Sequence, residues 1–121
     1  MPREYFADAA QAERSCSPAI KVTGGTPISL AGVGATTDES GQSLVGDFDG
    51  QVRATLERIR ATLARAGRTL DDIVTMTMFI KDMQYETYLT QGFPCSALIG
   101  IESLAQAEMM AEVQAIAVTG G

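Results

Sequence analysis

Residues 47–80, DFDGQVRATLERIRATLARAGRTLDDIVTMTMFI, contain the pattern that decides the fold. Their first part places apolar side chains at the three- and four-residue spacings of one helix face: Phe48, Val52, Leu56, Ile59 and Leu63. Asp47 and Asp49 suit the positive N-terminus of a helix, and Gly67 is a natural left-handed stop. We therefore expect a helix over residues 47–66.

The end of the same stretch, residues 73–80, predicts a strand that is buried on both faces. It is rich in β-branched residues, and neither of its faces is polar. One face holds Val74, Met76, Met78 and Ile80, and the other holds Ile73, Thr75, Thr77 and Phe79. Such a strand is covered on both sides, and the helix can cover only one of them. The sequence leaves open what covers the second face.

The rest of the chain predicts short elements around this unit. Residues 1–15 are polar and Ala-rich and predict a loose N-terminal arm. We expect strands at 18–23 and 27–31, a hairpin turn between them at Gly24–Gly25, an irregular continuation over 32–35, a polar turn at 36–41, a short helical crossover within 82–93, and strands at 97–101 and 109–118.

This order of elements predicts one α/β (α+β) domain over residues 1–121, with a mixed sheet and its helices on one face. The other face is semi-apolar, because Ile73, Phe79, Ile99 and Ile116 are candidates for it. A self-complementary partner is the economical cover for such a face. We therefore expect a homo-oligomer packed through its sheet.

The composition argues against several classes of protein. The net charge is −6, and the chain has no basic run away from the helix, so we expect no nucleic-acid partner. No apolar run approaches the roughly 18 residues of a membrane span, and the first residues lack the apolar core of a signal peptide. Cys16 and Cys95 are too few for a disulfide framework, so we expect both to be reduced in a cytoplasmic protein.

The chain contains no histidine. This absence excludes Ser-His and Cys-His nucleophile pairs and histidine metal sites, and we expect neither a metal nor a cofactor. Any proton transfer must use carboxylates, Tyr, Lys, Cys or bound water.

Three side chains near the C-terminal strands are candidates for a small-molecule site. Glu112 shares a strand face with Gln114 and can act as a general base or place a water, or it can be an interface carboxylate in an ion pair. Cys95 becomes a thiolate only beside a cation or a helix N-terminus, and is otherwise a buried small residue. Ser96 can hydrogen-bond a ligand but has no histidine to activate it.

The small residues after the second strand are further candidates. Gly32, Val33 and Gly34 can present backbone N–H groups to a carboxylate or carbonyl oxygen, or they can form a β-bulge.

The stretch 46–83, GDFDGQVRATLERIRATLARAGRTLDDIVTMTMFIKDM, resembles the signature of the RidA (YjgF/YER057c/UK114) family. There a Gln in the long helix, an Ala-Gly before Leu-x-Asp-Ile-Val, and a strand that ends in Asp recur in this order. The matching positions are Gln51, Ala66–Gly67, Leu70, Asp72–Val74 and Asp82, and Pro94 and residues 112–117 resemble the family's C-terminal end. The resemblance runs from about residue 18 to residue 118.

The resemblance implies a chorismate-mutase-like α/β fold and a homotrimer whose sheets pack into a central barrel, with clefts between subunits. The family Glu that orients water corresponds to Glu112, and a family Gly corresponds to Gly32. Other family positions differ: the Arg that holds a substrate carboxylate is Ser96, the Ser before the Gly is Ala31, and the Tyr falls near Pro18. The segment 82–94 is shorter than is usual in the family.

The resemblance implies a hydrolase or deaminase that acts on a small enamine, imine or related amino metabolite in an intersubunit cleft. Glu112 would place the water, while Ser96, Cys95 and residues 31–33 would contact the substrate. Ser96 in place of the Arg predicts that 2-aminoacrylate-type acids are poor substrates. The alternative is a non-catalytic homotrimer of the same fold that binds a small metabolite, and a third is a subunit of a larger assembly that docks through residues 1–15. Some family members carry an endoribonuclease label, which we do not expect of an acidic chain.

Overall fold

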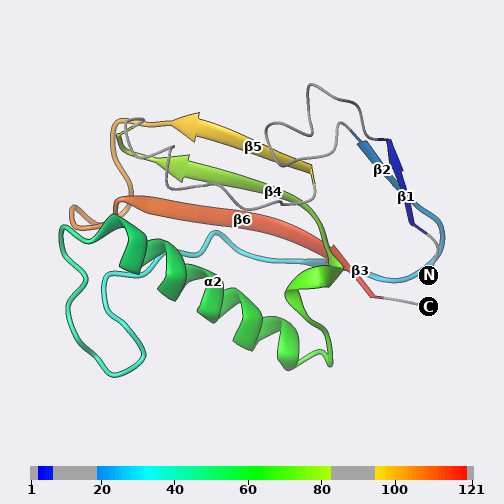
Figure 1. The fold of residues 1–121 in the computed structure, drawn as a ribbon, viewed down its shortest axis with the longest axis horizontal. Coiled ribbons are helices and arrows are strands. Elements are labelled where there is room, and N and C mark those ends of the chain that lie inside the picture. Colours follow the sequence, from blue (N-terminus) through cyan, green and yellow to red (C-terminus); the bar gives the residue numbers. More distant parts are fainter. Residues whose placement is uncertain (1–2, 7–18, 83–94, 120–121) are drawn as a thin grey trace.

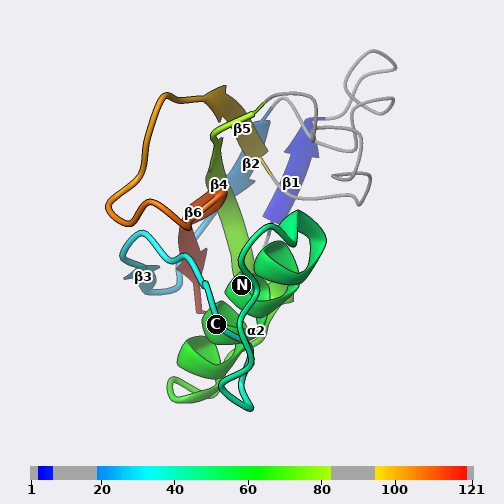
Figure 2. The same ribbon diagram turned by 90° about the vertical axis from the view of Figure 1, so that its left-hand side faces the viewer.

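The computed structural model describes residues 3–6, 19–82 and 95–119. Its centre is a four-stranded mixed sheet with one long helix, α2 (Phe48–Ala64), packed on one face (Figures 1 and 2). The spatial order of the strands is β3 (Pro27–Ser29), β6 (Ala111–Val118), β4 (Ile73–Ile80) and β5 (Cys95–Gly100). β4 is parallel to β5 and antiparallel to β6, and β6 is antiparallel to β3. The predicted mixed sheet with a helix on one face is confirmed.

α2 forms where the sequence predicts it, with bounds that differ by one or two residues. The Asp47 carboxylate accepts a hydrogen bond of 2.9 Å from the Gly50 N–H and caps the N-terminus. At the other end Gly67 has a φ of +70°, and the Arg68 N–H donates to the Leu63 carbonyl. A 3-10 helix, η1 (Leu70–Asp72), then leads into β4. The predicted apolar stripe packs on the sheet, with Leu56 partly buried and the other four members buried.

Two polar side chains of α2, Gln51 and Thr55, are fully buried beside this stripe. The Gln51 amide nitrogen donates to the Leu44 carbonyl (3.0 Å) and to the Glu108 carbonyl (2.9 Å), and its oxygen accepts from the Met110 N–H (2.8 Å). One side chain therefore joins the segment before α2 to the segment that enters β6.

The α2 side of the sheet is the core of the protein. β4 contributes Ile73, Met76, Met78 and Ile80 to it, all buried, and β6 contributes Ala111, Val113, Ala115 and Ala117. The prediction that Ile73 lies on the uncovered face is wrong. A register shift between Ile73 and Thr75 against β6 reverses the alternation, so that Ile73 turns toward the core.

The N-terminal region differs from the expected loose arm and hairpin. Residues 3–6 form strand β1 (Arg3–Phe6), which pairs antiparallel with β2 (Ala19–Val22) in a separate two-stranded sheet. Gly24 and Gly25 both have positive φ, as the turn prediction requires, but β2 and β3 lie in different sheets. The hairpin prediction is therefore wrong, because β1 supplies the partner for β2 and β6 the partner for β3.

The structure describes only part of the remaining segments that the sequence predicts. The polar turn forms around Asp38, and the last strand begins two residues later than predicted, at Ala111. Residues 7–15 of the arm and residues 83–94, which include most of the predicted crossover, lie outside the described residues. In the described part of the chain, no helix combines the length and apolarity that crossing a membrane would need.

Candidate functional site

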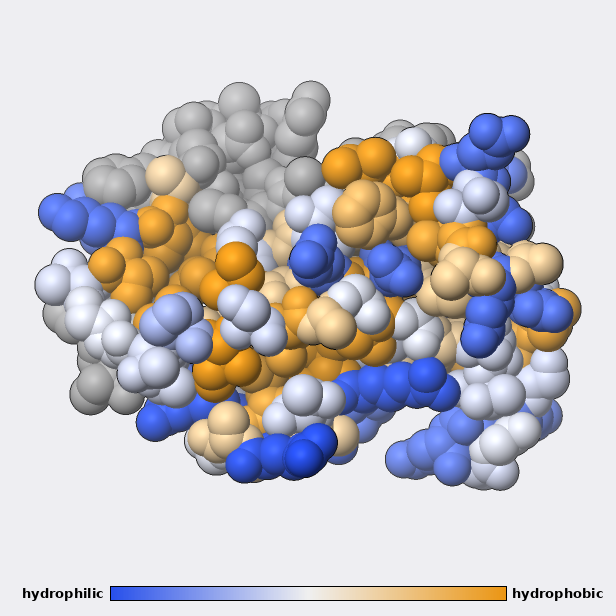
Figure 3. Space-filling model, turned by 180° about the vertical axis from the view of Figure 1, so that it is seen from behind, coloured by the Kyte–Doolittle hydropathy of each residue, from blue (hydrophilic) through white to orange (hydrophobic). Residues whose placement is uncertain are grey.

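The sheet face away from α2 is organised in rows by the strand register. Successive rows are Glu112–Phe79–Ile99, Gln114–Thr77–Ala97 and Ile116–Thr75–Cys95, and Ser29 of β3 joins the last of them. Ile99 is 42% exposed and Ile116 is 39% exposed. Figure 3 views this side of the molecule and shows apolar side chains gathered over it between polar ones. In the isolated chain this face is a mixed surface, on which the exposed Ile99 and Ile116 lie among polar side chains.

A bulge beside β6 brings Gly32 against Glu112. The Leu30 N–H donates to the Ala115 carbonyl, and Val33 and Val113 exchange two hydrogen bonds, so that Ala31 and Gly32 together stand opposite Gln114. A β-carbon at Gly32 would lie 2.7 Å from Oε2 of Glu112. The missing side chain therefore lets this carboxylate lie directly against the backbone. The structure brings together two residues that the sequence analysis selected separately.

The environment of Glu112 combines partial burial with the absence of an ion pair among the described residues. Its side chain is half-buried, and its cross-strand neighbour Phe79 is partly buried beside it. In the described ranges 3–6, 19–82 and 95–119, no ion pair involves Glu112. The alternative of an ion-paired carboxylate therefore receives no support from a single copy of the chain.

A hollow of about 270 Å³ lies on the same side, over the second and third rows. Its polar lining is three hydroxyls and one amide: Ser29, Thr75, Thr77 and Gln114. Ser29, Thr75 and Thr77 are not among the site residues that the sequence predicts. The signal was present in the alternation of β4 and β6, where these side chains share the face that the helix does not cover.

Within one copy of the chain, the other predicted site residues are not placed to bind a ligand together with Glu112. The Val33 N–H donates to Val113, so it is not available to a ligand. By backbone register Cys95 pairs with Thr75 and Ser96 with Met76, and their side chains lie outside the described part. Position 96 is three residues along the strands and two strands across from Glu112, about 10 Å in each direction. One copy of the chain does not bring Glu112 and Ser96 together.

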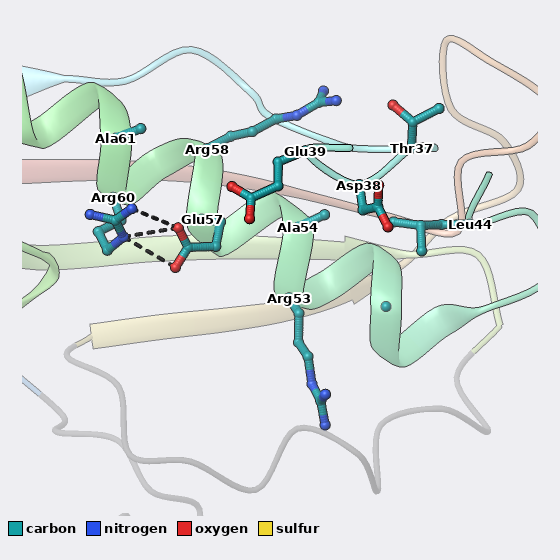
Figure 4. A pocket seen from close by; sticks show the side chains of 11 residues that line it. Thr37, Asp38, Glu39, Leu44, Arg53, Ala54, Glu57, Arg58, Arg60 and Ala61 are labelled. Atoms are coloured by element: carbon teal, nitrogen blue, oxygen red, sulfur yellow. Dashed lines mark hydrogen bonds and ion pairs between the residues drawn. The ribbon is translucent and has the colours of Figure 1, made fainter. Parts of the chain in front are cut away.

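A second pocket, of about 400 Å³, lies on the far side of α2, between the helix and residues 37–44 (Figure 4). Its cations already have partners within the chain: Arg60 bonds Glu57, Arg53 pairs with Asp49 at 2.9 Å, and Arg58 donates to the Gly34 carbonyl. Glu39 reaches over the helix from the loop, and Arg53 points away from it. Because α2 separates this pocket from the uncovered sheet face, it is not part of the site that contains Glu112.

The loop at this second pocket is held by Asp38, which gives it a pH dependence. The Asp38 carboxylate accepts from the Ser40 hydroxyl (2.6 Å) and from the Ser40 and Gln42 N–H groups, and these bonds lower its pKa below the ordinary 3.8, that of the Ser40 hydroxyl most. The bonds stabilise the loop above pH 3.8 and are lost as the pH falls through the lowered pKa. We expect the amide resonances of Ser40 and Gln42 to titrate below pH 3.8 in an NMR titration. A midpoint at or above that value would contradict the loop geometry.

The described residues also bear on metal binding. Among them, no group of three or more His, Cys, Asp or Glu side chains is placed to hold a metal ion.

Comparison with known proteins decides the family. Residues 6–119 match the family described as Endoribonuclease L-PSP. The chain belongs to this family. A RutC family protein of Pyrococcus abyssi is 31% identical to it in an alignment of 109 positions that covers 84% of each chain.

Further relatives connect the family with the RidA resemblance. A 2-iminobutanoate/2-iminopropanoate deaminase of Salmonella typhimurium is 31% identical in an alignment of 83 positions that covers 60% of this chain and 64% of that protein. The crystal structure of YyfB, a Rid family protein of unknown function from Yersinia pestis, has a TM-score of 0.78 at 21% identity and covers 98% of this chain and 100% of its own. The RidA recognition and the expected α/β fold are confirmed.

Proposed function

We propose that this RidA-family chain hydrolyses a small enamine or imine to a carbonyl compound and ammonia, in a cleft between copies of the chain. The observation that carries the proposal is the Glu112 carboxylate, which is half-buried, has no ion-pair partner among the described residues, and lies against Gly32 on the uncovered face. The name of the Salmonella typhimurium relative, a 2-iminobutanoate/2-iminopropanoate deaminase, supports the reaction class.

Glu112 has the chemistry that imine hydrolysis needs. Water must attack the imine carbon, and a carboxylate within hydrogen-bond reach can orient that water and accept its proton. The same proton can then pass to the nitrogen that leaves as ammonia. The chain has no histidine to take this role, and Glu112 is the carboxylate that the sheet presents on this face.

The assembly that we propose is a homotrimer packed through the uncovered sheet face. Ile99 and Ile116 are exposed there in the isolated chain, and burying them favours association. The separation of Glu112 from the start of β5 supports a site shared between copies, because a second copy can place its own residues 95 and 96 beside this Glu112. A small-molecule ligand would then lie in the intersubunit cleft.

The proposal is tested by generating imines from several amines and amino acids with oxidases and measuring carbonyl release with and without the purified chain. Acceleration over the buffer rate supports it. The absence of acceleration for every imine contradicts it.

A non-catalytic oligomer that binds a metabolite is the second candidate function. The hollow over the second and third rows favours it, because its hydroxyls and amide can hydrogen-bond a ligand but contain no acid or base. A metabolite that binds in calorimetry and is recovered unchanged would support this function over catalysis.

The contact between Gly32 and Glu112 gives a further prediction. In Gly32→Ala the new methyl group displaces the Glu112 carboxylate, so we expect carbonyl release to fall about 10-fold or more because the base is moved from its position. The free energy of unfolding should change little, since the displaced atoms are the end of a flexible side chain. Full activity in a variant of native stability would contradict the placement of the carboxylate.

A further inference from the structure

The hollow over the second and third rows of the uncovered sheet face contains hydrogen-bonding groups that the fold does not use. Its polar lining comes from three strands: Ser29, Thr75, Thr77 and Gln114. Within the described ranges 3–6, 19–82 and 95–119, none of these four side chains takes part in a hydrogen bond. The core differs, because the buried side chains of Gln51 and Thr55 both donate to backbone carbonyls. Four unpaired groups around one hollow therefore indicate a partner that the fold does not supply.

This hollow begins one row from Glu112. Gln114 follows Glu112 on the same face of β6, and Thr77 lies opposite Gln114 on β4. The segment that pairs with β6 on its other side joins the two places, since Ser29 borders the hollow and Gly32 lies against Oε2 of Glu112. Two residues of a strand span about 6.8 Å, so one small molecule can contact Glu112 and the hollow at the same time.

The lining of the hollow determines which chemical group fits it. Hydroxyls and a carboxamide both donate and accept hydrogen bonds, and none of the described residues that line the hollow is charged. A carboxamide or a hydroxyl on a ligand matches this lining, because such a group also donates and accepts. An alkyl group of the same size would leave the lining groups unpaired once a second copy of the chain excludes water from the face.

We infer that the substrate carries an uncharged hydrogen-bonding group, a carboxamide or a hydroxyl, which the hollow binds while the imine carbon lies at Glu112. This inference rests on the proposed function and names its substrate class, imines with a polar, uncharged side chain. A group about three bonds from the imine carbon, together with a hydrogen bond of about 2.9 Å, covers the spacing of about 6.8 Å between the rows. Thr77 and Gln114 are then specificity-determining residues, and Glu112 keeps its role toward water.

The test compares two imines of the same shape. An amino-acid oxidase of broad specificity generates the imine of asparagine and the imine of leucine, in which an isopropyl group replaces the carboxamide. We expect the wild-type chain to accelerate release of the 2-oxo acid about 10-fold or more better from the asparagine imine. Equal or greater acceleration with the leucine imine overturns the inference and leaves the proposed function standing, and so does acceleration confined to imines other than these two. No acceleration with any imine overturns both.

A pair of matched variants tests whether the hollow causes the preference. Thr77→Val removes one hydroxyl from the hollow and keeps the shape of the side chain, and Thr62→Val makes the same change at an exposed position of α2. We expect Thr77→Val to lower the ratio of the asparagine-imine rate to the leucine-imine rate by about 5-fold, and Thr62→Val to leave it unchanged. A loss of folded protein lowers both rates together, so the ratio separates substrate binding from a structural role. An unaltered ratio in folded Thr77→Val overturns the inference.

Discussion

Replacing Glu112 by glutamine lowers the acceleration of carbonyl release by about 100-fold or more, which is the usual loss when a general base is removed. The introduced amide keeps the size of the side chain and its approach to Gly32 but cannot accept a proton from water. The measurement is the initial rate of aldehyde or ketone formation from an enzymatically generated imine, for the variant and the wild type at equal protein concentration.

The matched control for this variant is Glu102→Gln, which removes an exposed carboxylate from the loop before β6. It changes the net charge by the same amount and should leave the rate unchanged. A Glu112→Gln variant as active as Glu102→Gln would remove Glu112 from the mechanism. A rate loss accompanied by unfolding in circular dichroism would instead assign Glu112 a structural role.

Replacing Gln51 by alanine has the largest expected effect on stability. The change leaves the Leu44 and Glu108 carbonyls and the Met110 N–H without their partner at a site with no exposed side-chain surface. Each buried group that loses its hydrogen bond costs about 1–3 kcal/mol, so we expect the free energy of unfolding to fall by about 3 kcal/mol or more. Denaturant titration of the wild type and the variant measures this difference.

Gln42→Ala is the control for this measurement, because Gln42 is an exposed glutamine in the loop before α2. It should change the free energy of unfolding by no more than about 0.5 kcal/mol. If the two variants were equally stable, the Gln51 bonds would not be holding the segment before α2 to the entry of β6.

The main unit of the fold could be predicted because its signals are local. The apolar spacing from Phe48 to Leu63 and the left-handed Gly67 determine α2 without reference to the rest of the chain. The run of β-branched residues in β4 likewise predicted a strand that is covered on both faces, and α2 covers one of these faces. Sequence patterns that depend only on neighbouring residues therefore predicted these elements correctly.

Features that depend on pairing between distant segments could not be predicted. Ile73 faces the core because β4 shifts register against β6, and β2 leaves β3 because β1 pairs with it. A glutamine in a helix is expected at the surface, but Gln51 is buried because its amide donates to the Leu44 and Glu108 carbonyls. Tertiary contacts decided each of these cases over local propensity.

The candidate site was predictable in its residues but not in its geometry. Residue chemistry selected Glu112 and Gly32, but only the bulge opposite Gln114 sets the carboxylate against the glycine backbone. The hydroxyls of Ser29, Thr75 and Thr77 were not predicted as site residues, because they come together only when β3, β6 and β4 are paired.

The central claim is that a second copy of the chain, docked on the uncovered sheet face, completes the site around Glu112. Ile116→Asp tests it most directly, because this 39%-exposed side chain lies on that face two rows from Glu112 and outside the core. We expect a folded monomer in which wild-type acceleration of carbonyl release falls to about the buffer rate, since burial of a charge opposes association. A monomer as active as the wild-type oligomer would contradict the account.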